Sequence, residues 1–224
     1  MEILEAGVHT IAPHIQAHIF ESHQPGPTAI IQAGIHGDEI AGVHALQGML
    51  EGGIRPLKGR LIVIPVMNPG AFQSKTRAAP NGLDLNRCFP GDPESDALEN
   101  RLAHRFMSLV MAEQPRLVAT LHESKKRYDP LVNPSFGQTL VYGVKPMPPE
   151  VGLVVDRLNE EIRDPNEQWA PQYYPVDTSS TEVIVAAVGC LGVCVETWMG
   201  FDLARRVQMQ QSVVRYLLAS IGMA

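Results

Sequence analysis

Short apolar runs alternate with amphipathic stretches along most of the chain, and this alternation constrains the fold more than any single residue does. Residues 28–34 and 59–68 are apolar runs typical of buried strands, and residues 39–51 between them place apolar side chains at helical intervals. Together they form a βαβ unit. Such alternation predicts an α/β fold with a sheet covered by helices on both faces. The pattern continues with predicted helices at 92–114, 148–163, 179–188 and 202–220 and predicted strands at 116–122 and 191–197.

Composition narrows the class of protein. With 224 residues, 45% of them hydrophobic, the chain is long enough for one substantial core and short for two, so we expect residues 1–224 to form a single domain. A net charge of -6 without a long basic run argues against nucleic-acid partners. No apolar run reaches membrane-spanning length, and the first thirty residues do not resemble a signal peptide, so we expect a cytoplasmic protein without a membrane partner. Three cysteines do not make a disulfide framework.

Polar residues recur where the predicted strands end. His36 and Glu39 follow the strand at 28–34, and Asn68 ends the next strand. His122 ends the third strand, and Glu196 lies near the end of the last. In an open α/β sheet, the carboxyl ends of the strands border the crevice in which ligands bind. We therefore expect these side chains to gather at one edge of the sheet.

Two histidines and a glutamate form a candidate metal site. Catalytic zinc takes three protein ligands, with His2Glu among the known sets, and keeps a fourth position open for water. His36 and Glu39 are three residues apart at a turn into a helix, and His122 would complete the set from another strand. Each residue alone also has an ordinary structural interpretation: a helix-capping histidine, a first-turn acid favoured by the helix dipole, and a hydrogen-bonded core histidine.

A long loop rich in glycine, proline and asparagine follows the second predicted strand. Residues 68–92 carry Arg77, Asp84, Asn86 and Arg87, and loops of this length are usually functional or disordered. Arginine and asparagine beside a cationic metal would suit an anionic substrate, because a guanidinium group binds a carboxylate through two parallel hydrogen bonds. An exposed loop with incidental charges is the alternative.

Four motifs in the order "GIHGDE", "TRAAPNGLDLNRCFPGD", "TLHES" and "VETW" resemble the zinc carboxypeptidase superfamily, in particular its branch of succinylglutamate desuccinylases and aspartoacylases. The resemblance extends from about residue 28 to residue 200. It implies a three-layer fold with a mixed, largely parallel, twisted sheet. It also implies one zinc ion per chain, held by His36, Glu39 and His122.

The same resemblance implies roles for five further residues. Asp84 would hydrogen-bond to the first zinc histidine and fix its tautomer. Asn86 and Arg87 would bind the substrate carboxylate. Arg77 would polarise the scissile carbonyl group, and Glu196 would act as the general base.

Two departures limit what the resemblance transfers. Full desuccinylases and aspartoacylases usually add a C-terminal β-rich domain that shapes the substrate pocket, whereas one predicted helix follows "VETW" here. The separation of Glu39 from His122 is also shorter than in the digestive carboxypeptidases. Those enzymes carry a tyrosine on a mobile loop before the base, and Tyr174 could take that role as a substrate-binding residue, although a loop aromatic packed on the surface explains it equally well.

The resulting hypothesis is a zinc-dependent hydrolase that cleaves an amide bond adjacent to a free carboxylate, in an N-acyl amino acid or a short peptide. A cell-wall peptide amidase or carboxypeptidase is the alternative within this class, and a catalytically silent carboxylate-binding module is the alternative outside it. A nucleophilic Cys194 with His122 as its base is also conceivable. It would leave Glu39, Asp84 and Arg77 unused, however, and buried cysteine is usually a small apolar residue. The basic run 125–127 could gather anionic substrates or could be a solvated loop.

Overall fold

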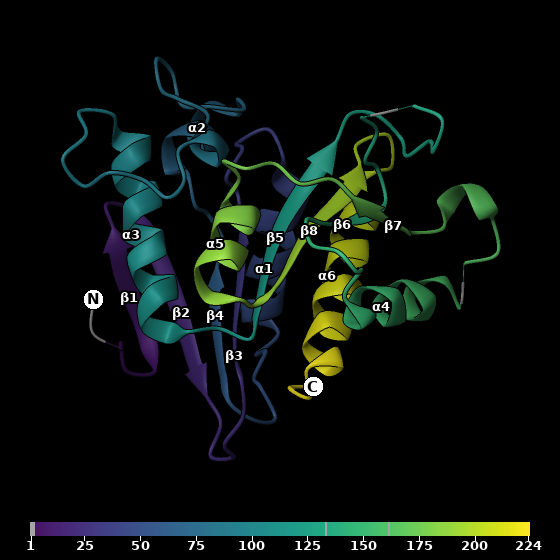
Figure 1. Cartoon of the computed structure of the whole chain (residues 1–224), viewed down its shortest axis with the longest axis horizontal. Coiled ribbons are helices and arrows are strands. Elements are labelled where there is room, and N and C mark those ends of the chain that lie inside the picture. The colour runs from purple at the N-terminus through teal and green to yellow at the C-terminus, as the bar shows by residue number, and fades with distance from the viewer. Residues whose placement is uncertain (1–2, 133, 161) are drawn as a thin grey trace.

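The structure, a computed structural model, describes residues 3–132, 134–160 and 162–224. Within these residues the strands form one mixed, eight-stranded sheet (Figure 1). The strands are β1 (Gly7–Ala12), β2 (Ile15–Glu21), β3 (Thr28–Ala33), β4 (Arg60–Ile64), β5 (Leu117–Ser124), β6 (Thr139–Tyr142), β7 (Ala170–Tyr173) and β8 (Leu191–Trp198). Their order across the sheet is β1-β2-β4-β3-β5-β8-β6-β7. The central strands β4, β3, β5 and β8 pair in parallel, as do β6 and β7, whereas β1, β2 and β4 pair antiparallel with one another in turn, as do β6 and β8.

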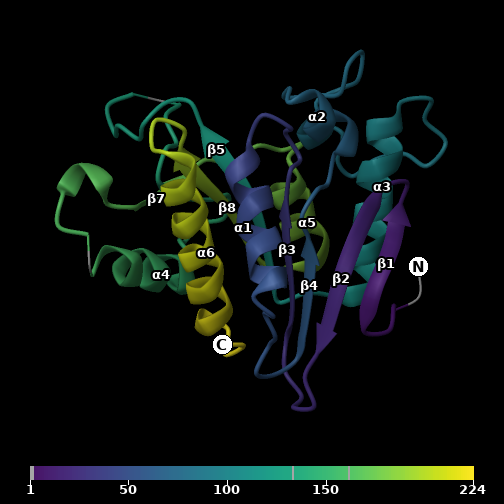
Figure 2. The same cartoon turned by 180° about the vertical axis from the view of Figure 1, so that it is seen from behind.

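Helices cover both faces of this sheet. Figure 1 shows α3 and α5 in front of the sheet, and Figure 2 shows α1 and α6 in front of the opposite face, with α4 beside them. The predicted three-layer α/β fold with a mixed, largely parallel sheet is therefore confirmed. Among the described residues, each helix is too short or too polar to reach across a lipid bilayer. The helices named here are α1 (Ile40–Glu51), α3 (Leu98–Glu113), α4 (Pro149–Asn159), α5 (Ser180–Val188) and α6 (Leu203–Ser220).

The central strands are nearly continuous apolar runs because they are buried on both faces. Every residue of β4 is buried, and so is every residue of β3 after the first. Successive side chains point to opposite faces of a strand. The cross-strand neighbours Ile31 and Val63 therefore join the core under α1 and α6, whereas Ile30 and Ile62 join the core under α3.

The helix predicted at 92–114 begins later than expected, at Leu98. The polar residues at its expected start form local turns instead of capping it. Asp92 and Ser95 each accept a hydrogen bond from the backbone N–H two residues further on, at 2.9 and 3.2 Å. Side-chain bonds of this kind compete with helix formation, so the predicted start at residue 92 is wrong.

Several other elements differ from the sequence pattern. The helix predicted at 148–163 is α4, which ends at Asn159, and position 161 lies outside the described residues. The sequence pattern does not reveal the hairpin of β1 and β2 or the short strands β6 and β7. It also does not reveal α2 (Pro69–Ser74) or the single 3-10 turn η1 (Leu85–Arg87), which lie inside the long loop at 68–92.

Candidate metal centre

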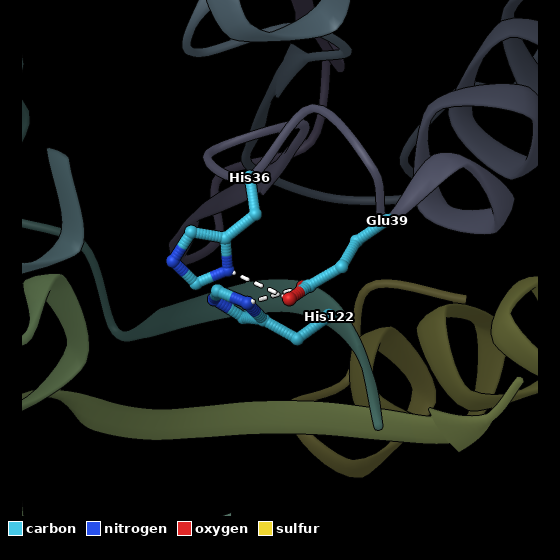
Figure 3. Close-up of side chains that lie close together, drawn as sticks. All are labelled: His36, Glu39 and His122. Atoms are coloured by element: carbon cyan, nitrogen blue, oxygen red, sulfur yellow. Dashed lines mark hydrogen bonds and ion pairs between the residues drawn. The ribbon is translucent and has the colours of Figure 1, made fainter. Parts of the chain in front are cut away.

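Three elements bring His36, Glu39 and His122 together at the carboxyl edge of the sheet. His36 lies in the turn after β3, Glu39 immediately precedes α1, and His122 lies in β5, which pairs with β3. In Figure 3 both imidazole rings approach the carboxylate, with His36 Nδ1 2.8 Å from Oε1 and His122 Nδ1 2.8 Å from Oε2. All three residues are buried, and one potential ligand atom from each lies within 4.8 Å of the others. Two imidazole nitrogens and one carboxylate oxygen are the donor set that catalytic zinc sites use.

Glu39 does not have the ordinary structural role of a helix-capping acid. It occupies the N-cap position of α1, but its side chain makes no capping hydrogen bond. Its two oxygens face the histidines instead, and Oε2 also accepts a hydrogen bond from the backbone N–H of Glu123 at 3.1 Å. The carboxylate is therefore turned away from its own helix and toward the other two candidate ligands.

Asp84 contacts the second ring nitrogen of His36. The distance from His36 Nε2 to Asp84 Oδ1 is 3.1 Å. Burial alone would lower the pKa of His36, but the hydrogen bonds to Asp84 and Glu39 outweigh it and raise this pKa to about 9. A carboxylate on each side of one imidazole ring holds its orientation and gives the cluster an affinity for positive charge. The side chains present therefore fit a bound cation.

Arg77 reaches the cluster from the long loop. Its Nε and Nη2 lie 3.0 and 2.9 Å from Asp84 Oδ2, and its Nη1 lies 3.6 Å from Glu39 Oε1. The side chain is 50% exposed, so one end of the guanidinium group is held by a carboxylate while the rest is accessible from solvent. Although burial opposes it, contact with His36 and Arg77 holds the pKa of Asp84 well below its usual range.

Asn86 and Arg87 are positioned by η1. Asp84 caps this 3-10 turn by accepting a hydrogen bond from the Asn86 N–H at 3.0 Å. The Asn86 side-chain oxygen accepts hydrogen bonds from the backbone N–H and the hydroxyl group of Ser180, at 2.9 and 3.1 Å, which ties the loop to the start of α5. Arg87 is exposed and donates to the Asn86 carbonyl oxygen at 2.9 Å. In the described parts of the chain it forms no ion pair with an acid.

Glu196 lies in β8 at the position paired with His122 of β5. Its Oε2 is buried and has no hydrogen-bond partner among the residues that the structure describes. Burial and the nearby charge of Glu39 raise the pKa of this carboxyl group well above its ordinary value. Tyr174 follows β7 and packs edge-on against Phe136, with ring centroids 4.9 Å apart.

The predicted site residues surround one cavity of about 430 Å³. Asp84 is the exception, because it contacts His36 from outside the lining. Asn68 also does not line the cavity, contrary to its predicted place at the site. Its Oδ1 accepts the Ala71 N–H at 3.1 Å and caps α2. The predicted residues in the lining are His36, Glu39, Arg77, Asn86, Arg87, His122, Tyr174 and Glu196.

A buried polar network behind the cluster is not apparent from the sequence. The Glu123 side chain is fully buried, and its Oε2 accepts the Ala41 N–H at the start of α1 at 2.9 Å, while Oε1 pairs with Arg206 of α6. Gln210 of α6 donates to the carbonyl oxygen of His122 at 2.8 Å. The contacts of Arg206 with Glu123 and of Gln210 with His122 each join residues more than 80 positions apart in the sequence. Neither residue spacing nor local pattern could therefore identify the network.

The amino-acid sequence matches a known family over its first half. Residues 25–131 match the succinylglutamate desuccinylase/aspartoacylase catalytic domain. N-alpha-acetyl-L-2,4-diaminobutyric acid deacetylase from Halomonas elongata is 38% identical over 46% of this chain and 30% of its own length. Murein peptide amidase A from Vibrio campbellii is 33% identical over 42% of this chain and 47% of its own length. The chain thus spans less than half the length of either curated relative.

Solved structures share the fold over nearly the whole chain. The cell shape determinant protein Csd4 from Helicobacter pylori superposes with a TM-score of 0.81, covering 94% of this chain and 56% of that protein at 20% identity. An aspartoacylase family protein from Mesorhizobium loti superposes with a TM-score of 0.70, covering 94% of this chain and 62% of that protein, also at 20% identity. At this level of identity the likeness establishes the fold.

Proposed function

Because residues 25–131 match the succinylglutamate desuccinylase/aspartoacylase catalytic domain, we propose that the protein is a metal-dependent hydrolase of amide bonds. Its substrate carries a free carboxylate next to the bond that is cut. One observation carries the proposal: the three candidate metal ligands line the same cavity as the Glu196 carboxyl group, whose Oε2 has no hydrogen-bond partner among the described residues, and the Arg87 guanidinium group, which has no acidic partner among them. A histidine cluster with a purely structural role would not require the carboxyl group of Glu196 or the guanidinium group of Arg87.

His36, Glu39 and His122 are the residues that would hold the metal, and zinc suits their nitrogen and oxygen donors. The chemistry that zinc supplies in a His2Glu site is polarisation of the substrate carbonyl group and a lowered pKa of water. Asp84 keeps the His36 ring oriented through Nε2, so that Nδ1 faces Glu39 and the cavity.

Arg87 and Asn86 bind the substrate carboxylate in this proposal. The exposed guanidinium group of Arg87 has no acidic partner within the described residues, and a planar fork of N–H donors matches a carboxylate. The Asn86 side-chain oxygen is already used by Ser180, which leaves its amide N–H groups to donate toward the cavity. Fixing the substrate at one end aligns its amide bond with the reacting groups.

Glu196 transfers the proton. Its buried Oε2 accepts a proton from the attacking water and later returns it to the leaving amine. The raised pKa makes the carboxylate a stronger proton acceptor, and a group whose pKa lies near the working pH can both take up and return a proton. Arg77 donates to the oxyanion as the carbonyl carbon becomes tetrahedral, a contribution of roughly 3 kcal/mol in comparable sites. Tyr174 lines the cavity and contacts bound substrate.

N-acyl amino acids are the first substrates to test, and short peptides are the second. The curated relatives include a deacetylase of an N-acetylated amino acid and a peptide amidase. One solved relative is described as a D,L-carboxypeptidase. All three activities cleave amide bonds, and their names differ in what lies on either side of that bond.

Metal analysis of the purified protein followed by substrate assays tests the proposal. We expect about one zinc ion per chain, lost in His122→Ala and retained in His44→Ala, which alters an exposed histidine on α1. Glu196→Gln should lower kcat by roughly 10²- to 10⁴-fold, whereas Glu51→Gln at an exposed position should not. A zinc-loaded protein that cleaves neither N-acyl amino acids nor short peptides would overturn the hydrolase assignment. Binding of these compounds without turnover would then favour a carboxylate-binding module.

A further inference from the structure

The cavity contains a carboxylate that the proposed reaction does not use. Glu182 lies in the first turn of α5, is half-buried, and lines the same cavity as His122 and Arg87. In sequence, Ser179 and Glu182 have the spacing of a capping box, in which the glutamate would accept the N–H of the capping serine. That N–H donates instead to the Val176 carbonyl oxygen at 2.8 Å. The Glu182 carboxylate is therefore free of its expected helix-capping role.

The backbone at the end of β6 leaves room for this carboxylate. Gly143, directly after β6, faces Glu182 so closely that a Cβ atom at position 143 would lie 1.7 Å from Oε2 and 2.1 Å from Oε1. Only a glycine at this position lets the carboxylate occupy its observed place. The Glu182 carboxylate therefore packs closely against the backbone at the end of β6.

Glu182 is the acid in this lining that has neither a cationic partner nor a proposed chemical role. Asp38 pairs with a lysine at 3.4 Å, and Glu39 faces the two candidate ligand histidines. Glu123 pairs with an arginine of α6, and Glu196 is the proposed base. Within the described residues Glu182 forms no ion pair, and both burial and the neighbouring Asp177 raise its pKa. A cation placed beside it would relieve this unfavourable negative charge.

One cavity thus presents the Arg87 guanidinium group and the Glu182 carboxylate, and neither has a partner of opposite charge in the part of the chain that the structure describes. The segments that carry Arg87 and Glu182 are joined by hydrogen bonds, because Ser180 of α5 donates to the side-chain oxygen of Asn86, the neighbour of Arg87. We propose that Glu182 is a specificity-determining residue that selects substrates whose amino-acid portion carries a cationic side chain, such as N-acyl diamino acids. This inference rests on the proposed function, in which Arg87 binds the carboxylate of the same amino acid. Glu182 receives the ammonium group through a charge-assisted hydrogen bond.

Matched substrates and variants test the selection. Nα-acetylornithine and Nα-acetylnorleucine have side chains of similar length and differ by one positive charge, and Nα,Nδ-diacetylornithine removes the charge chemically. We expect the wild-type protein to prefer Nα-acetylornithine in kcat/KM by about 10- to 100-fold, the usual contribution of a hydrogen bond to a charged group. Glu182→Gln should abolish the preference, mainly through KM, and leave Nα-acetylnorleucine within about twofold. Glu182→Asp should restore part of it, and Glu94→Gln, at an exposed loop position, should change neither substrate.

Calorimetric binding of free ornithine and norleucine separates this inference from the proposed function, because it requires no turnover. Tighter binding of ornithine that is lost in Glu182→Gln supports the assignment even if no amide is cut. Hydrolysis of both acetylated substrates at equal rates, or an equal loss on both in Glu182→Gln, would overturn the selection while the hydrolase assignment stood. Failure of free ornithine to bind would also overturn it.

Discussion

The buried ion pair between Glu123 and Arg206 gives a quantitative test of how α6 supports the metal centre. The Glu123 side chain is 0% exposed and that of Arg206 is 14% exposed. Replacing Arg206 by Met keeps most of the aliphatic stem but leaves a buried carboxylate without its counter-ion. Breaking such a pair from one side usually costs roughly 3–5 kcal/mol. Glu123 keeps its hydrogen bond from the Ala41 N–H, so we expect about 3 kcal/mol, at the low end of that range.

Urea unfolding followed by tryptophan fluorescence and circular dichroism measures this loss. Arg215→Met is the matched control, because Arg215 lies on the same helix and is exposed, and its removal should change the free energy of unfolding by about 0.5 kcal/mol or less. The double variant with Glu123→Gln and Arg206→Met should be more stable than the sum of the single effects predicts, because neither charge is then left alone. The reasoning is refuted if Arg206→Met costs no more than Arg215→Met, or if the two single effects add.

Three further predictions concern the site itself. Burial raises the pKa of all three cysteine thiols, that of Cys190 to about 11. Ellman's reagent at pH 8 should therefore react slowly with the folded protein and rapidly after denaturation. A fast reaction at Cys194 would instead support the alternative in which this cysteine is the nucleophile. Asp84→Asn should weaken zinc binding by about 10- to 100-fold in a chelator competition, because His36 loses its carboxylate partner, and an unchanged affinity would show that Asp84 does not position the ring. Arg87→Lys should lower kcat/KM for carboxylate substrates by about tenfold, since lysine cannot form the two-point contact, and equal activity would remove Arg87 from the substrate site.

Much of the fold could be predicted from the sequence because strands that are buried on both faces are apolar runs in the sequence. The strands at 28–34 and 116–122 are apolar on both faces, and parallel strands of this kind end at one edge of the sheet. His36 and His122 follow from that rule, and the structure brings them together. The hairpin of β1 and β2 has no such apolar pattern. Exposed, partly buried and buried residues mix in β1, and residues 7–21 contain three histidines.

Some residue roles could not be predicted from the sequence pattern, because contacts in the folded chain decide them. Asn68 ends its strand as a site residue would, but a proline and a short helix follow it, and capping that helix takes its side chain. Glu182 has the spacing of a helix cap, and only the three-dimensional path of the Ser179 N–H shows that it is free. The cationic partner of Glu123, Arg206, comes from α6, whose sequence is that of an ordinary amphipathic helix.

The attachment of α6 to the metal centre has a consequence for the order of folding. Gln210 and Arg206 of α6 hold the carbonyl oxygen of His122 and the side chain of Glu123, which lie more than 80 positions earlier in the chain. Contacts of such long sequence separation form late, because the loop-closure entropy must be overcome first. A nascent chain can therefore form the βαβ unit with His36 and Glu39 early. The carbonyl oxygen of His122 receives its hydrogen bond from Gln210 only when α6 docks. A metal ion that binds before α6 docks would meet an incomplete site, so tight binding is expected to coincide with the docking of α6.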